Sequence, residues 1–231
     1  ARSAGYTTLV LTTDVAVHRN RARPRRNRSK LRVSDTPKVI LDGCLHPRWS
    51  FDLLRHGKPE LANFVTTDAT NLEIQAAIMS RQMDASFDWQ ALRWLRDLWP
   101  HTLLVKGILN AHDAARCISE GVDGVILSNH GGRQLDCSVS PMEALVQSVQ
   151  ATGKPVLIDS GFRRGSDIVK ALALGAEAVL LGRATLYGLA ARGEAGVTEV
   201  LTLLRADIDR TLAQIGCPSI SDLSHEYLVS N

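Results

Sequence analysis

From residue 103 onward, short apolar runs alternate with amphipathic stretches, and this alternation constrains the fold more than any other feature of the chain. The apolar runs lie at 103–107, 124–129, 155–159 and 178–182. Helices are expected to follow them at 111–121, from Pro141 onward, at 165–174 and over 184–215. Four strand–helix units in a row predict a parallel sheet with right-handed crossovers. A fifth strand is expected at 7–14, and a further helix at 89–99.

The ends of the expected strands carry polar side chains, which decides between two parallel architectures. Each strand has one at or just past its end, namely Asp14, Lys106, His130, Asp159 and Arg183. A Rossmann sheet concentrates its signal in one G-x-G-x-x-G loop, and the sequence has none. Loops that share one site at the carboxyl ends of all strands are typical of a TIM (β/α)₈ barrel. Because only five strands are expected, we predict that residues 1–231 form the C-terminal part of a barrel, about strands 4–8.

The composition is that of an ordinary globular protein with one large domain, since 45% of the 231 residues are hydrophobic and 22% are charged. The four cysteines form no C-x-x-C pair, so neither a disulfide framework nor a metal site is expected, and a cytoplasmic location is favoured. No apolar run approaches the length of about 18 residues that a membrane span needs. The chain opens on Ala1, which looks like the inside of a domain.

A strongly basic run lies at residues 19–32, which hold eight Lys and Arg residues and no acid. The run fits a solvated or substrate-facing loop, a patch for anionic lipid, or a nucleic-acid arm. Pro24 argues against a helix, and the absence of interleaved aromatic residues makes nucleic acid the least favoured partner. A long loop is expected over about 16–85. Its apolar residues, such as Trp49 and Phe51, make it a candidate membrane-associating insert.

The strand at 124–129 runs directly into the string S-N-H-G-G-R-Q-L-D, which combines several chemically useful residues. His130 offers a base that titrates near neutral pH, and Arg133 offers a planar fork for a carboxylate. Gly131 and Gly132 allow a ligand to approach the backbone closely. The alternative interpretation is a glycine-rich turn with a capping histidine.

The last two strands lead into loops that are suited to a phosphate group. The first loop is D-S-G-F-R-R-G at 159–165, and the second is G-R at 182–183. Barrels commonly bind phosphate with the loops after strands 7 and 8, where backbone N–H groups and a helix N-terminus meet the anion. Arg163 and Arg183 would add charge-assisted hydrogen bonds. The alternative is that these arginines pair with Asp159 or Asp167.

Together, these motifs resemble the FMN-dependent α-hydroxy acid dehydrogenase and oxidase family. The resemblance rests on S-N-H-G-G-R-Q-L-D, on K-G at 106–107 before it, and on D-S-G-F-R-R-G and G-R after it. It runs from about Tyr6 to Ala191 and is most specific from Leu103 on. The insert L-D-G-C-L-H-P-R-W-S at 41–50 is most similar to the membrane-associated branch of the family, which oxidises mandelate.

The resemblance implies a role for each of five residues in catalysis. His130 would be the active-site base, and Asp14 the carboxylate that stabilises its imidazolium. Arg133 would bind the substrate carboxylate, and Arg21 stands where the family has a second substrate-binding arginine. Lys106 would be the cation beside flavin N1 and O2.

The resemblance also implies a set of FMN contacts. Thr12 and Ser128 would contact the isoalloxazine edge or ribityl chain. The ribityl-phosphate site would comprise Asp159, Gly161, Arg163, Gly182 and Arg183.

Two departures from the family pattern stand out. The loop at 18–27 keeps Arg21 and Asn27 but lacks a glycine and two acids of the family pattern. The family's first three strands, with their active-site tyrosines, have no counterpart in the chain.

The function implied by the resemblance is FMN-dependent oxidation of a mandelate-like 2-hydroxy acid to the 2-oxo acid, with electrons passed to a membrane quinone. The alternatives are an oxidase that uses O₂ and a truncated, inactive flavin-binding remnant. The expected partners are the hydroxy acid, an anionic membrane surface and a quinone, with no nucleic acid, and a homo-oligomer is expected. The expected location is the cytoplasm, with peripheral attachment to the inner membrane.

Overall fold

The computed structural model describes residues 1–17, 37–57 and 84–229. The chain divides into two compact units, each described by itself. The first unit combines Ala1–Val15 with Ser86–Asn231, and the second comprises Ala16–Ala85. Arg21 and the basic run at 19–32 lie outside the described residues.

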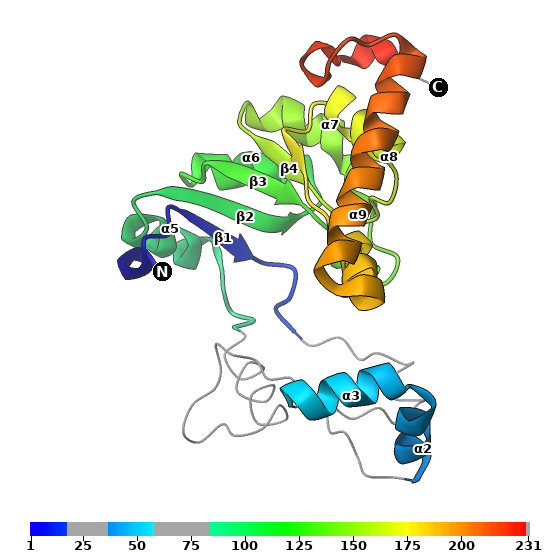
Figure 1. Ribbon diagram of the computed structural model, residues 1–231. Coiled ribbons are helices and arrows are strands. Elements are labelled where there is room, and N and C mark those ends of the chain that lie inside the picture. The colour runs from blue at the N-terminus through cyan, green and yellow to red at the C-terminus, as the bar shows by residue number, and fades with distance from the viewer. Residues whose placement is uncertain (18–36, 58–83, 230–231) are drawn as a thin grey trace. The chain divides into compact units, whose positions relative to one another are not determined.

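The first unit is built on a parallel sheet of five strands whose spatial order equals their order in the sequence (Figure 1). The strands are β1 (Thr8–Thr12), β2 (Thr102–Ile108), β3 (Gly124–Leu127), β4 (Val156–Ile158) and β5 (Ala178–Val179). β3 is buried along its whole length, as expected for a strand with helices on its face. Because all five strands are parallel, their carboxyl ends lie at one edge of the sheet.

Five helices alternate with the strands along the chain, in the pattern predicted from the sequence. They are α5 (Trp89–Leu98), α6 (Ala111–Ser119), α7 (Pro141–Thr152), α8 (Gly165–Ala173) and α9 (Arg183–Ile215). Local sequence explains where they begin. The Asp88 carboxylate accepts from the N–H of Ala91 at 2.9 Å, the Asn110 side chain caps α6, and Pro141 occupies the first turn of α7.

The core lies between the strands and these helices. Its fully buried members include Leu103 and Val105 of β2, Val125 of β3 and Leu145 of α7. Short 3₁₀ helices complete this unit, at η1 (Arg2–Ala4), η3 (His130–Gly132), η4 (Ile220–Asp222) and η5 (His225–Tyr227).

The structure departs from the sequence-based expectation in the lengths of the strands and in one helix. β1, β3, β4 and β5 are shorter than the apolar runs that predicted them, at 7–14, 124–129, 155–159 and 178–182, and β2 is longer than the run at 103–107. α9 is not a single straight helix, because Arg192 and Gly193 interrupt it with non-helical backbone. The apolar pattern of a sequence alone does not predict the residue at which a strand's hydrogen bonding ends, nor the residue at which a helix is interrupted.

Within the segment 16–85, where a long loop is expected, the described residues of the second unit include two helices. These are α2 (Pro37–Leu45) and α3 (Pro47–His56), each of which begins with a proline. Proline suits the first turn of a helix because the N–H that it lacks would have no partner there. Among the described residues, no helix is both long enough and apolar enough to cross a membrane.

Candidate active site

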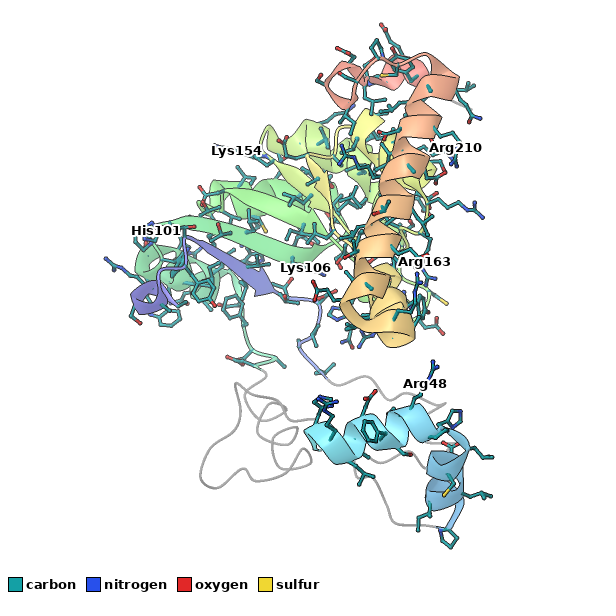
Figure 2. All side chains as sticks on the ribbon, viewed as in Figure 1. Arg48, His101, Lys106, Lys154, Arg163 and Arg210 are labelled. Atoms are coloured by element: carbon teal, nitrogen blue, oxygen red, sulfur yellow. The ribbon has the colours of Figure 1, made fainter. Side chains whose placement is uncertain are left out.

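Candidate residues from four strands lie at the carboxyl edge of the sheet, where Figure 2 labels Lys106. Asp14 follows β1, Lys106 lies near the end of β2, His130 follows β3, and Asp159 follows β4. These residues are distant in sequence and meet only because parallel strands end together.

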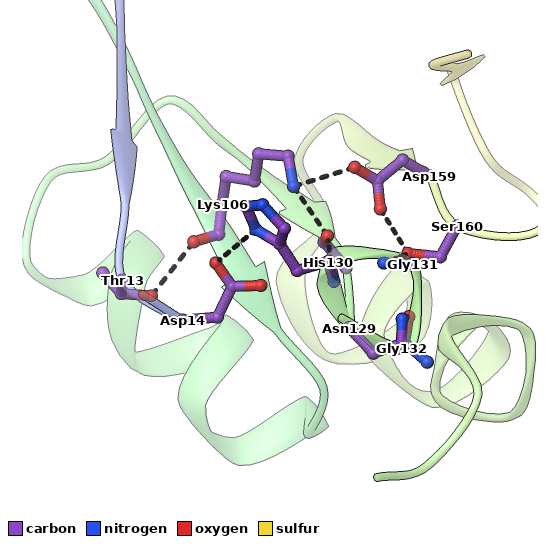
Figure 3. A network of polar contacts seen from close by, with 10 residues as sticks. Thr13, Asp14, Lys106, Asn129, His130, Gly131, Gly132, Asp159 and Ser160 are labelled. Atoms are coloured by element: carbon purple, nitrogen blue, oxygen red, sulfur yellow. Dashed lines mark hydrogen bonds and ion pairs between the residues drawn. The ribbon is translucent and has the colours of Figure 1, made fainter. Parts of the chain in front are cut away.

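Asp14 and His130 form a half-buried pair (Figure 3). The distance between His130 Nδ1 and Asp14 Oδ1 is 3.3 Å. An ionised carboxylate only accepts hydrogen bonds, so this contact favours the proton on Nδ1 and leaves Nε2 able to accept a proton. The backbone of His130 has φ +55°, a left-handed conformation that is uncommon outside glycine. The pair therefore has the chemistry of a general base with its orienting carboxylate.

A second pair lies beside the first. The Lys106 ammonium contacts Asp159 Oδ2 at 2.8 Å and donates to Ser128 Oγ at 2.6 Å. The same Ser128 hydroxyl accepts from the backbone N–H of His130 at 3.0 Å. Burial of Asp159 favours its neutral form, but hydrogen bonds from Lys106, Ser128 and Ser160 outweigh this effect and lower the pKa of Asp159 from its ordinary value of 3.8. The site therefore holds a fixed cation next to its base.

Ser160 is a site residue that the sequence reasoning missed. Its hydroxyl donates to Asp159 Oδ1 at 2.7 Å and accepts from the N–H of Gly131 at 2.9 Å. It therefore bridges the loop after β4 and the loop after β3 (Figure 3). Its φ of +76° is unusual for a residue with a side chain. The sequence signal was a serine inside the phosphate-loop motif, but the sequence alone does not reveal its partner.

The two arginines expected at the phosphate site do not form the ion pairs considered as an alternative. Asp159 pairs with Lys106, and Asp167 accepts from the backbone N–H of Arg164 at 3.2 Å. Arg183 instead donates to the carbonyl of Gly131 at 2.7 Å. The Arg163 guanidinium lies 5.0 Å from the ring centre of Tyr187, which is a cation–π contact.

A cavity of about 310 Å³ lies at this edge of the sheet. Its polar and glycine lining comprises Lys106, His130, Gly131, Arg133, Asp159, Ser160, Gly161, Arg163, Gly182 and Arg183. A Cβ added to Gly161 or Gly182 would meet nothing within 4 Å, so the backbone there is open to a ligand. Two guanidinium groups and exposed loop backbone suit a phosphate group. The volume is at the lower limit of ligand sites, about 300–1,000 Å³, and suits one end of FMN.

The structure brings most of the predicted site residues together. Those that line the cavity are Lys106, His130, Arg133, Asp159, Gly161, Arg163, Gly182 and Arg183. Asp14 and Ser128 do not line the cavity, but each contacts a residue that does: Asp14 contacts His130, and Ser128 accepts a hydrogen bond from Lys106. Thr12 is the last residue of β1, where it is exposed and is not part of the lining. Arg21 lies outside the described residues.

The comparison with known families agrees with this geometry. The sequence model of the FMN-dependent dehydrogenase family matches residues 1–230. The chain therefore belongs to the family of FMN-dependent dehydrogenases.

Individual relatives show which members of the family the chain is similar to. The chain is 76% identical to (S)-mandelate dehydrogenase of Pseudomonas putida over 228 residues, which are 99% of this chain and 58% of the relative. It is 40% identical to the peroxisomal (S)-2-hydroxyacid oxidase of Arabidopsis thaliana, with 99% of this chain and 57% of the relative covered.

A solved structure is similar over the whole chain. The crystal structure of the monotopic membrane protein (S)-mandelate dehydrogenase matches with a TM-score of 0.96 at 75% identity, covering 100% of this chain and 62% of that chain. The predicted fold class, a part of a TIM barrel, is thereby confirmed. The chain spans less than two thirds of the length of these relatives.

Proposed function

We propose that this chain, within a complete flavoprotein, oxidises a mandelate-like 2-hydroxy acid to the 2-oxo acid with FMN. One observation carries the proposal: the Asp14–His130 pair, the Lys106–Asp159 pair and an arginine-lined cavity share one edge of the sheet. A 2-hydroxy acid needs a base, a clamp for its carboxylate and an electron acceptor. The site offers the first two and suits a phosphate-bearing cofactor.

The chemistry of each side chain indicates its role in the reaction. His130 Nε2 takes a proton from the substrate, and Asp14 stabilises the imidazolium that results. Arg133 binds the substrate carboxylate with two parallel N–H groups. Arg163 and Arg183 would hold the FMN phosphate, and Lys106 would place its positive charge near the flavin ring. FMN, when bound, accepts the two electrons of the oxidation.

The test uses a chimera in which this chain is joined to the part of the Pseudomonas putida relative that it does not span; we name it the completed barrel. His130→Ala in the completed barrel should slow anaerobic flavin reduction by (S)-mandelate by about 10²–10⁴-fold while FMN stays bound. His112→Ala, an exposed histidine on α6, is the matched control and should reduce at the parent rate. Stopped-flow bleaching of the flavin at near the parent rate in His130→Ala would contradict the proposal.

The electron acceptor belongs to the proposal as well. The relative at 76% identity is named a dehydrogenase and the one at 40% an oxidase, which favours a membrane quinone over O₂. Reoxidation of the reduced completed barrel by a soluble quinone should exceed reoxidation by air-saturated buffer. Faster reaction with O₂ would identify an oxidase instead.

A membrane surface is the proposed location. Support comes from α3, where Phe51 and Leu54 are exposed and lie one turn apart, with Arg48 and Arg55 beside them. Exposed apolar side chains flanked by cations are typical of helices that lie in a lipid interface. The solved relative is itself described as monotopic. Because the proposed electron acceptor is a membrane quinone, the inner membrane is the proposed location.

A homo-oligomer is also part of the proposal. Its support is the exposure of several apolar side chains on α9, including Leu189, Leu201 and Leu203. Apolar surface of this kind is common at contacts between subunits. Light scattering of the completed barrel should give a mass of two or more chains, and a monomer would contradict this part.

A further inference from the structure

β2 contains an irregularity next to its catalytic lysine. Lys106 pairs with Ile126 of β3, whereas Ile108 pairs with Leu127, so Gly107 is an extra residue in the ladder. Its φ is +106°, which a residue with a side chain rarely adopts. Bulges of this kind often redirect side chains beside active sites. The bulge therefore separates Lys106 from the regular part of the strand that follows it.

The space beside Gly107 is filled by Asp14. A Cβ added at Gly107 would lie 2.7 Å from Asp14 Cβ and 2.9 Å from both Asp14 Cγ and Asp14 N. Real Cβ atoms do not approach other atoms so closely. Asp14 can occupy its observed position only because residue 107 has no side chain.

Hydrogen bonds hold the Asp14 carboxylate only weakly. Oδ1 contacts His130 at the long distance of 3.3 Å, and the buried Oδ2 has no hydrogen-bond partner among the described residues. The backbone just before Asp14 is anchored firmly, because Thr13 N and Thr13 Oγ1 both donate to the Lys106 carbonyl, at 2.9 and 3.0 Å. The direction of the carboxylate therefore depends on packing against Gly107.

We propose that Gly107 is a positioning residue: its missing side chain lets Asp14 dock against the bulge and face His130. The proposal rests on the function proposed above, in which His130 is the base. A methyl group at position 107 would displace Asp14 from His130 and leave Arg133 untouched. The expected effect is a lower kcat with little change in the KM for the hydroxy acid.

The test is a double-mutant cycle in the completed barrel with Gly107→Ala and Asp14→Ala. Each single variant is expected to lower kcat by about 10–100-fold. Because both act through one contact, the double variant should fall within about threefold of the worse single variant. If the double variant instead shows the product of the two single losses of kcat, the proposed role of Gly107 is overturned. A parent-like kcat in Asp14→Ala would instead contradict the proposed function, so the two failures are distinguishable.

Gly175→Ala is the matched control for backbone strain. Gly175 has a φ of +97°, and its added Cβ would lie 3.0 Å from Val149 Cγ1, remote from the site. This variant should melt at a lower temperature than the parent at an unchanged kcat. A fall in kcat matching that of Gly107→Ala would overturn the proposal, because strain alone would then suffice.

A crystal structure of Gly107→Ala supplies a readout that is independent of activity. The Asp14–His130 distance should exceed hydrogen-bond range, and an unchanged 3.3 Å would overturn the proposal. If Gly107→Ala does not fold, the second change Asp14→Gly decides. It removes both side-chain atoms that the methyl group would meet, whereas the contact with Asp14 N and the positive φ of residue 107 remain. The double variant should therefore recover part of the yield of folded protein, and a yield no higher than that of Gly107→Ala would count against the proposal.

Discussion

Ser128 is the residue at which the two halves of the candidate site meet. It is fully buried, and its hydroxyl accepts one hydrogen bond from the Lys106 side chain and one from the His130 backbone. The base and the cation therefore share an anchor inside the protein. Removing this acceptor is costly, because the His130 N–H loses the hydrogen bond and the Lys106 ammonium keeps only Asp159.

Ser128→Ala tests this arrangement. In the completed barrel it should lower the free energy of unfolding by about 1–3 kcal/mol, because Lys106 and the His130 N–H lose their common acceptor. Ser148→Ala is the control, since Ser148 is equally buried but its hydroxyl has no partner among the described residues. Removing that hydroxyl should be neutral or stabilising. Urea denaturation measures both, and equal losses would contradict the anchoring role of Ser128.

The Lys106–Asp159 pair should make stability depend on pH at the acid end. Because the folded state lowers the pKa of Asp159 below 3.8, the ionised carboxylate stabilises the fold above about pH 4. This contribution is lost as the pH falls through the lowered pKa. Asp159→Asn should therefore be less stable than the parent at pH 6, and the difference should shrink below pH 4. Urea titrations at several pH values provide the measurement, and a constant difference would contradict the assignment.

At the scale of elements, the presence and order of the strands were predictable, and their exact ends and the contacts between loops were not. Apolar runs that lead into Lys106, His130 or Asp159 predict buried parallel strands that carry polar residues to one edge of the sheet. The bridge made by Ser160 and the docking of Asp14 against Gly107 depend on distances between separate loops. A sequence pattern carries no such distances.

The segment 16–85 shows a second limit of sequence reasoning. A long loop is expected there, and Pro24 argues against a helix in the basic run, yet Pro37 and Pro47 begin helices. A proline breaks a helix in its interior but is favoured in its first turn, so its position within the element decides its effect. The apolar residues that suggested a membrane insert, Trp49 and Phe51, are exposed on α3, as that hypothesis requires.

Membrane binding by α3 is tested with Phe51→Ser/Leu54→Ser. The Leu54 side chain is 86% exposed, so these substitutions should disturb the fold little while removing apolar contact with lipid. The variants are made in the completed barrel. In co-sedimentation with vesicles that contain anionic lipid, the double variant should shift to the supernatant. Trp94→Ser, which replaces a residue of α5 that is 61% exposed, is the control and should sediment like the parent. Equal sedimentation of all three proteins would reject the role of α3.

At the scale of the whole molecule, the described residues form a sheet with two edges, β1 and β5. A closed (β/α)₈ barrel joins its edges through further strands, and its interior is filled by side chains from all of them. Two open edges with apolar faces invite pairing with other chains. The relatives, of which this chain spans 58% in one case, have residues that this chain does not supply.

The isolated 231-residue chain is therefore expected to be poorly soluble or molten and not to turn over. Net stability is about 5–15 kcal/mol, and the described residues supply only five of the eight strands of a closed barrel, a deficit that should exceed it. Calorimetry and near-UV circular dichroism should show no cooperative transition and no fixed aromatic signal, whereas the completed barrel should show both. A yellow, monomeric and cooperatively melting preparation of the isolated chain that reduces a dye with mandelate would contradict this expectation.

The sequential order of the strands also bears on how the site matures during folding. β2 and β3 pair across a short stretch of chain, whereas the first contact of β1 with β2 near the site, from Thr13 to Lys106, closes 93 residues. Each doubling of a flexible loop costs about 0.6 kcal/mol more in closure entropy, so nearby pairings form first. Asp14 follows β1 and is expected to arrive last. The cation and its partners would then be assembled before the base acquires its carboxylate.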